Sequence, residues 1–423
     1  MRVRTSAARL LAGAVACAAA CGAPPGRAQL PVASTTRANP APPARVAWAL
    51  TWRGHAIGGA WERDAPEQFE RRERIVVRRG EDLVISDLAI TIERDAAGEP
   101  YQVGVTRWQD GPVLEGTAMR TADGGWSVEL EGEPATLLPA AAPFELVLRA
   151  GQEFHGTVLL AGWGFATAHL ELRPSAGTAR LHVGGRTLDA AIVYDEDGAI
   201  ASIAGGDGID ATRAALDADL RPAAPPEVVD GNAIAVDGAP TAPAAPTLTL
   251  LDATAPPPPP LPGQRPVSGQ PWTVTLDASA DSDLPLPAQR SADRTAEITA
   301  LVRRVAREID DDLATTSTTT GAALAATRGD CTTHALRFAA LATEANISTR
   351  VVTGLRLDGQ TLIRHRWNLA WTGARWITVD PTFDESPAAP ALVGLAAHGA
   401  RAADLAAADA TVFDGLGHRA TLR

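Results

Sequence analysis

The segment GDCTTHALRFAALA, residues 329–342, decides the fold of the C-terminal part of this 423-residue chain. Asp330 is a typical N-cap residue, and the apolar residues behind it recur at the spacing of one helix face. A helix that begins here places Cys331 in its first turn, where free amides and the helix dipole stabilise negative charge. The position favours the thiolate, the nucleophilic form of cysteine. The alternative is a small buried structural cysteine.

The residues around this helix predict a packed α+β unit. Residues 298–309 have the apolar period of an amphipathic helix. Residues 348–357 and 361–371 have strand character on either side of an Asp-Gly turn, and a third strand begins at Trp376 after a glycine turn. A helix packed on three antiparallel strands is therefore expected.

Cys331, His365 and Asp380 are the candidate catalytic residues. His365 lies on the same face of its strand as Trp367, because strand side chains alternate, and Asp380 lies near the end of the third strand. Attack on an amide needs a soft nucleophile, a base and an acceptor that orients the base, and these three residue types supply them. The chemistry needs no cofactor, and the sequence predicts none.

Three short boxes resemble the signature of the transglutaminase-like superfamily: Gly329-Asp-Cys331, His365-Arg-Trp367 and Asp380-Pro-Thr382-Phe383. The resemblance covers about residues 290–386 and implies a papain-like cysteine protease fold. It implies that Cys331 is the nucleophile, His365 the general base and Asp380 the group that orients the imidazole. It also implies a protein or peptide substrate, with hydrolysis or transamidation through a cysteine thioester.

Three neighbours are predicted to line the site: Asp330, Trp367 and Trp376. The tryptophans form either a core that removes water from the His–Asp pair or a platform on which substrate stacks, and the first alternative is favoured. His334 follows Cys331 by three residues on the same helix, so it is expected to be a helix-surface neighbour rather than the base.

Residues 45–221 predict an antiparallel β domain, either a curved sheet or half-barrel or a sandwich. Short β-type runs, Phe144 to Leu148 among them, are separated by Asp-Gly and Gly-Gly turns with no convincing helix between them. Segments 52–59 and 193–198 resemble turns of β-rich domains that bacteria place ahead of catalytic modules. The histidines of this region are interpreted as ordinary sheet residues without metal-like clustering, and no metal site is predicted: His55, His155, His169 and His182.

Residues 222–285 form a Pro- and Ala-rich segment that is predicted to be a linker to the domain at 286–423. Residues 247–251 and 272–276 within it could each add an edge strand to one of the flanking domains. The predicted fold class is therefore α+β and multidomain.

The N-terminus reads as an export signal over residues 1–21, followed by a disordered tether at 22–44. A lipid anchor on Cys21 and simple cleavage both remain open. No later segment is long and apolar enough to span a bilayer. The predicted location is the periplasm, the outer membrane as a lipoprotein, or the extracellular space.

The net charge of −12 argues against a nucleic-acid partner. The leading hypothesis is an exported thiol acyl-transfer enzyme that acts on protein or peptide amides. Two alternatives stay open: a non-catalytic envelope binding or scaffolding protein that keeps the fold, and a cysteine amidase that cleaves peptidoglycan.

Overall fold

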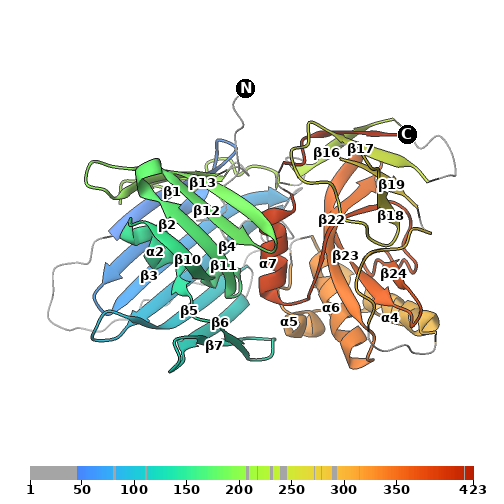
Figure 1. Cartoon of the computed structure of the whole chain (residues 1–423), viewed down its shortest axis with the longest axis horizontal. Coiled ribbons are helices and arrows are strands. Elements are labelled where there is room, and N and C mark those ends of the chain that lie inside the picture. Colours follow the sequence, from blue (N-terminus) through green and yellow to red (C-terminus); the bar gives the residue numbers. More distant parts are fainter. Residues whose placement is uncertain are drawn as a thin grey trace.

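The computed structural model divides the chain into two β-rich parts (Figure 1). It describes residues 45–423 except 80–81, 110–111, 206–208, 217, 229–231, 239–244, 271, 278, 288–292, 314 and 414. The predicted export signal, Cys21 and the tether lie outside the described residues. None of the helices in the described part of the chain has the length and apolar character needed to span a lipid bilayer.

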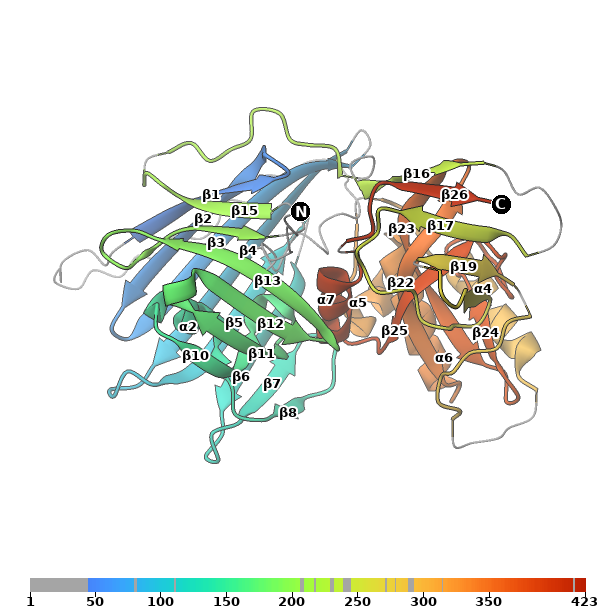
Figure 2. The ribbon, with the colours of Figure 1, turned by 45° about the horizontal axis from the view of Figure 1, so that its top comes forward.

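The first part is built on one curved sheet of 15 strands, in the order β8-β7-β6-β5-β4-β3-β2-β1-β15-β14-β13-β12-β11-β10-β9 (Figure 2). Neighbours are antiparallel except for β9 and β10, and alternate side chains along the strands are buried. The strands are β1 Arg45–Trp52, β2 His55–Ala65, β3 Gln68–Arg79, β4 Asp82–Arg94, β5 Pro100–Trp108, β6 Pro112–Arg120, β7 Trp126–Leu130, β8 Thr136–Leu138, β9 Ala142–Pro143, β10 Phe154–Leu160, β11 Ala166–Arg173, β12 Thr178–Val183, β13 Arg186–Tyr194, β14 Ile200–Gly205 and β15 Ile209–Ala214.

One predicted strand of this region is a helix. The residues from Phe144 to Leu148 belong to α2, Phe144–Ala150, and two short 3-10 turns, η2 Ala161–Trp163 and η3 Pro174–Ala176, also interrupt the strands. Phe144 and Leu148 are buried at helical spacing, and Gly151 ends the helix in the left-handed region. The strand prediction for this segment was wrong because a short apolar run fits either period.

The second part combines a nine-stranded sheet with four helices in the described residues. The sheet order is β18-β19-β17-β26-β16-β23-β22-β25, and β24 pairs with β23. Its strands are β16 Ile234–Asp237, β17 Thr247–Leu251, β18 Gln264–Pro266, β19 Thr273–Leu276, β22 Thr349–Asp358, β23 Thr361–Trp371, β24 Trp376–Val379, β25 Leu392–His398 and β26 Arg419–Leu422. The helices are α4 Thr295–Glu308, α5 Thr320–Ala325, α6 Cys331–Glu344 and α7 Ala402–Thr411, and β20 Asp310–Asp311 pairs with β21 Arg328–Gly329.

The segment at 222–285, which the sequence predicts as a linker, also supplies part of the second sheet. Strands β16 to β19 come from it, and both candidate edge segments join the C-terminal domain rather than the first one. Leu248, Leu250 and Val274 are buried in the core of this sheet. Their burial gives an apolar reason for these short strands to order within a Pro-rich segment.

Helix α7 lies between the two parts (Figures 1 and 2). Ala406 and Ala410 of this helix are buried in the apolar core of the first sheet. A backbone hydrogen bond of 3.2 Å from Gly321 N to Gly132 O also joins the parts, and the Thr318 hydroxyl donates to the Val113 carbonyl oxygen. The two parts therefore share a packed boundary.

Candidate active site

Asp330 fixes the start of helix α6 and with it the position of Cys331. Its Oδ1 accepts hydrogen bonds from the backbone amides of Thr332, at 3.0 Å, and Thr333, at 3.1 Å. This is the predicted N-cap, and it leaves the half-buried Cys331 in the first turn of the helix. Amides in the first turn of a helix have no acceptor within the helix, so the Cys331 amide is the candidate donor to a bound oxygen atom.

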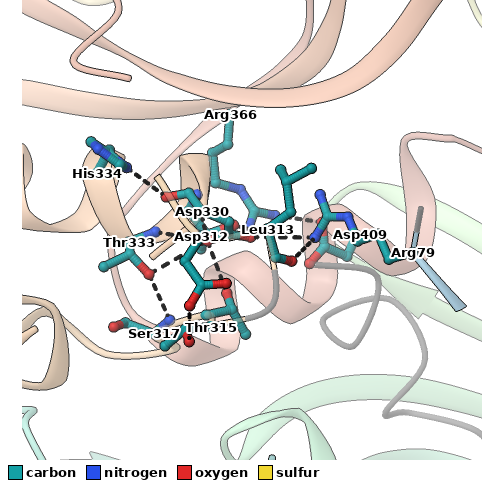
Figure 3. Close-up of polar contacts among 12 residues, drawn as sticks. Arg79, Asp312, Leu313, Thr315, Ser317, Asp330, Thr333, His334, Arg366 and Asp409 are labelled. Carbon is teal, nitrogen blue, oxygen red and sulfur yellow. Dashed lines mark hydrogen bonds and ion pairs between the residues drawn. The ribbon is translucent and has the colours of Figure 1, made fainter. Parts of the chain in front are cut away.

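The carboxylate of Asp330 is buried among partners from several segments (Figure 3). Thr316 Oγ1 donates to its Oδ1 at 3.2 Å, and Arg79 Nη1 lies 3.9 Å from its Oδ2. Burial raises the pKa of Asp330, while the charge of Arg79 and the hydrogen bond from the Thr333 amide oppose this rise. Arg79 belongs to β3, so the first sheet reaches the start of the Cys331 helix.

His365 and Asp380 form a buried pair behind the thiol. His365 Nε2 is 2.7 Å from Asp380 Oδ2, and both His365 and Cys331 line the same pocket. Burial alone lowers the pKa of His365, but the charge and hydrogen bond of Asp380, together with Cys331, raise it to about 10. The imidazole is therefore protonated at neutral pH and lies between two groups that can carry negative charge.

Arg356 holds Asp380 in its charged form. Its Nη1 is 2.9 Å from the same Oδ2 that faces His365, and its Nη2 is 3.0 Å from Glu385 Oε1. Burial raises the pKa of Asp380, but His365, Arg356 and the Thr382 amide outweigh it and leave the pKa below its usual value. Arg356 was not among the predicted site residues, although the register of the Asp358-Gly359 hairpin places it on the same sheet face as His365.

Aromatic rings cover the imidazole on two sides. Trp367 stacks on His365 with ring centroids 5.9 Å apart at 19°, and Phe383 meets it edge-on at 5.5 Å. Trp367 is buried, as the favoured core interpretation expects. Trp376 packs against Trp371 at 5.7 Å, in an apolar cluster behind Trp367.

A small pocket of about 60 Å³ opens onto Cys331. Asp330 lines this pocket, whereas Trp367 and Trp376 lie outside its lining. The pocket is also lined by Arg79, Thr318, His365, Arg366 and Asp409. Arg366 Nη1 is 3.0 Å from Thr332 Oγ1, and its Nη2 forms a buried ion pair with Asp409 of α7. Arg79 and Asp409 carry no local sequence signal, because distant elements bring them to the pocket.

His334 is buried rather than on the helix surface. Its Nδ1 is 2.9 Å from the carbonyl oxygen of Asp330, and its Nε2 is 3.6 Å from Asp311 Oδ1. The surface prediction was wrong because α5 and β21 pack against α6, and Asp311 of β20 lies beside the His334 ring. The imidazole that lines the pocket with Cys331 is that of His365.

The interpretation that the histidines of the first sheet do not cluster is also wrong. The ligand atoms of His155, His169 and Glu171 lie within 4.8 Å of one another. The pairing of strands β10 and β11 brings His155 beside His169 and Glu171, which follow it by 14 and 16 residues in the sequence.

Comparison with known protein families gives a match over the segment that holds this site. Residues 287–381 match the model of the transglutaminase-like superfamily. This segment is a transglutaminase-like domain. It includes α4 to β24 and runs two residues beyond β24 to Pro381, so it contains Cys331, His365 and Asp380. No curated protein matches the chain.

Three solved structures show partial likeness to the chain. A Cytophaga hutchinsonii protein provisionally assigned as a cysteine protease is 22% identical with a TM-score of 0.23, over 30% of this chain and 40% of that one. The chain thus spans about 40% of the length of that protein. A β-barrel-like protein of the domain of unknown function DUF1849 from Brucella abortus is 14% identical, with a TM-score of 0.29 over 41% of this chain and 96% of that one. A duf1089 family protein from Pseudomonas aeruginosa is 14% identical, with a TM-score of 0.24 over 41% and 95%.

Proposed function

We propose that the transglutaminase-like domain makes this chain a thiol acyl-transfer enzyme that acts on protein or peptide amides. The observation that carries the proposal is the arrangement of Cys331 at a helix start, in a pocket that His365 also lines, with His365 2.7 Å from Asp380. A thiolate beside an imidazolium is the reactive pair of papain-like enzymes.

The proposed reaction begins when the Cys331 thiolate attacks the amide carbonyl carbon. The carbonyl oxygen becomes an oxyanion, and the Cys331 amide at the start of α6 is placed to donate to it. Protonated His365 gives its proton to the departing nitrogen, the C–N bond breaks, and a thioester remains on Cys331. Neutral His365 then accepts a proton from water or from an amine that attacks the thioester, which gives hydrolysis or transamidation and restores the thiolate.

Export is a further element of the proposal. The proposed export rests on the order of charged, apolar and small residues in the segment 1–21. An exported enzyme would act in the bacterial envelope or outside the cell. An envelope enzyme of this kind would meet protein and peptide amides as its substrates.

The rate of alkylation of Cys331 by iodoacetamide, measured against pH, tests the proposal. We expect rapid reaction at pH 6 in the wild type, no reaction at this position in Cys331→Ala, and a strongly reduced rate in His365→Asn, which keeps the thiol. A wild-type rate that stays low until about pH 8 to 9, as for an ordinary thiol, would contradict an activated nucleophile.

A second experiment separates the enzyme from the alternatives. Wild type and Cys331→Ala are incubated with protein substrates and a primary amine, and with purified peptidoglycan. Amine incorporation or peptide cleavage by the wild type alone supports the proposal, while released stem peptides identify the peptidoglycan amidase. Equal partner binding by both proteins without any acyl adduct identifies a scaffolding protein.

A further inference from the structure

Four potential metal ligands meet on the outer face of the first sheet, far from the thiol in the sequence. His155 lies on β10, His169 and Glu171 on β11, and His182 on β12. His155 Nε2 is 3.2 Å from His169 Nε2 and 4.0 Å from Glu171 Oε1. His182 Nε2 is 3.6 Å from the same Oε1. The four side chains therefore converge around one carboxylate oxygen and one pair of imidazole nitrogens.

Strand pairing produces this cluster. His155 is directly opposite Glu171, and His169 is directly opposite His182. Residues in such cross-strand pairs have Cβ atoms about 5 Å apart, and residues two apart on one strand share a face. The buried residues on either side, Ala168, Leu170 and Leu172, face the core. The cluster thus stands on three rigid adjacent strands rather than on loops.

The distances fit a small four-coordinate cation. Zinc binds imidazole nitrogen at about 2.0–2.1 Å in tetrahedral geometry, so that two nitrogen ligands are roughly 3.3 Å apart. The 3.2 Å between the Nε2 atoms of His155 and His169 matches this edge. The longer distances to Glu171 close by small rotations, because the side chains of His155 and His182 are 70% and 38% exposed.

Hydrogen bonds behind the cluster orient two of the ligands. His182 Nδ1 is 2.9 Å from Thr187 Oγ1 on β13, and donation from Nδ1 leaves Nε2 with the lone pair that a metal needs. Arg173 Nη2 donates to Glu171 Oε2 at 3.4 Å, whereas the histidines face Oε1. In metal sites, the atom of a ligand that does not bind the metal commonly forms a hydrogen bond that orients the side chain.

We propose that His155, His169 and Glu171, with His182 as the fourth ligand, bind a divalent transition metal of the zinc class. Imidazole and carboxylate ligands suit zinc, and Cu²⁺ competes because it binds such sites more tightly. The ion would join β10, β11 and β12 on the outer face of the sheet. This site is independent of the proposed acyl-transfer reaction.

Zinc binding to the full chain tests the proposal by isothermal titration in Cys331→Ala, in which the active-site thiol cannot contribute a ligand. We expect one Zn²⁺ per chain, and at least about a 100-fold loss of affinity when His169→Ala is added. Glu171→Gln keeps the shape of its side chain and should also weaken binding. His55→Ala, an exposed histidine at the start of β2, is the matched control and should bind as before.

Co²⁺ replacement provides the second readout, because a tetrahedral site gives intense visible d–d bands that a hydrated surface ion lacks. We expect these bands in Cys331→Ala and their loss in His169→Ala. Far-UV circular dichroism checks that both variants are folded. The proposal is overturned if Cys331→Ala binds no Zn²⁺, or if His169→Ala and Glu171→Gln bind it as tightly as the control.

Discussion

The Asp380 carboxylate lies between two cationic partners at the scale of single residues. His365 and Arg356 both reach its Oδ2, at 2.7 and 2.9 Å. Arg356 also covers the Phe383 ring, with its guanidinium carbon 3.7 Å from the ring centroid. Phe383 in turn meets the His365 imidazole edge-on. Two cationic groups therefore stabilise the ionised carboxylate through the same oxygen atom.

Replacing Asp380 by Asn should remove the charge that keeps His365 protonated. We expect the alkylation rate of Cys331 at pH 6 to fall by about 10-fold or more, and to recover only toward pH 8 to 9 as for an ordinary thiol. The measurement is the pH profile of iodoacetamide reaction. Asp384→Asn, at an exposed position four residues after the pair's carboxylate, should leave the profile unchanged.

The His365–Asp380 pair makes the free energy of unfolding depend on pH. The pKa of His365 is raised to about 10, so its contribution is complete below about pH 6.5 and is lost as the pH rises toward 10. The pKa of Asp380 is lowered, so its contribution is present above about pH 4 and is lost on further acidification. Urea midpoints of wild type and Asp380→Asn should therefore differ most between about pH 4 and 6.5; a constant difference across pH would contradict this.

At the scale of elements, the backbone of β22 lies very close to its neighbouring strands at Gly354, next to the candidate site. Gly354 pairs with His365 on one side and with Gly394 of β25 on the other. A Cβ at position 354 would overlap the Val393 carbonyl oxygen and lie 2.6 Å from the Trp367 ring. Trp367 is the ring that stacks on the catalytic candidate His365. A side chain at position 354 would therefore displace Trp367 and, with it, the His365 imidazole.

We expect Gly354→Ala to destabilise the protein by about 1–3 kcal/mol, because the extra methyl group overpacks the sheet. It should also slow the alkylation of Cys331 by shifting Trp367. Gly162→Ala is the matched control, since its new Cβ would be 3.4 Å from Leu88 at ordinary contact distance. Urea unfolding checks the stabilities, and equal midpoints for the two variants would count against this packing.

The sequence predicts the helices and strands of the second part better than it predicts which elements pack against one another. The helix after Asp330 and the two strands on either side of the Asp358-Gly359 turn appear as expected, because caps, turns and periodicity are local signals. The helix α2 was missed because its apolar run fits either period. The cluster around His169 was missed because it depends on the pairing of neighbouring strands. The position of Arg79 in the lining of the Cys331 pocket was missed because it depends on packing between the two parts of the molecule.

At the scale of the whole molecule, the first sheet supplies part of the pocket that contains Cys331. Arg79, the last residue of β3, donates from Nη1 to the Leu313 carbonyl oxygen at 3.0 Å and lies 3.9 Å from Asp330. The pKa of Asp330 is raised by burial, and Arg79 opposes that rise. The β domain therefore influences the residue that caps the Cys331 helix.

Replacing Arg79 by Ala should make Asp330 easier to protonate. We expect the acidic limb of the Cys331 alkylation profile to move upward by about one pH unit, because the N-cap bonds need the charged carboxylate. Arg78→Ala, at the neighbouring exposed position, is the control. An Arg79→Ala profile that coincides with that of Arg78→Ala would show that the first sheet does not act on the site.

Strand β26 has a consequence for the order in which the molecule is assembled. This strand, residues 419–422, lies between β17 and β16, although those two precede it in the chain by more than 150 residues. Ala420 and Leu422 fill the core there. While the chain is being synthesised, the sheet keeps an open slot in its middle until these residues leave the ribosome. The domain that holds the thiol is therefore complete only after the last of its strands along the chain has been made.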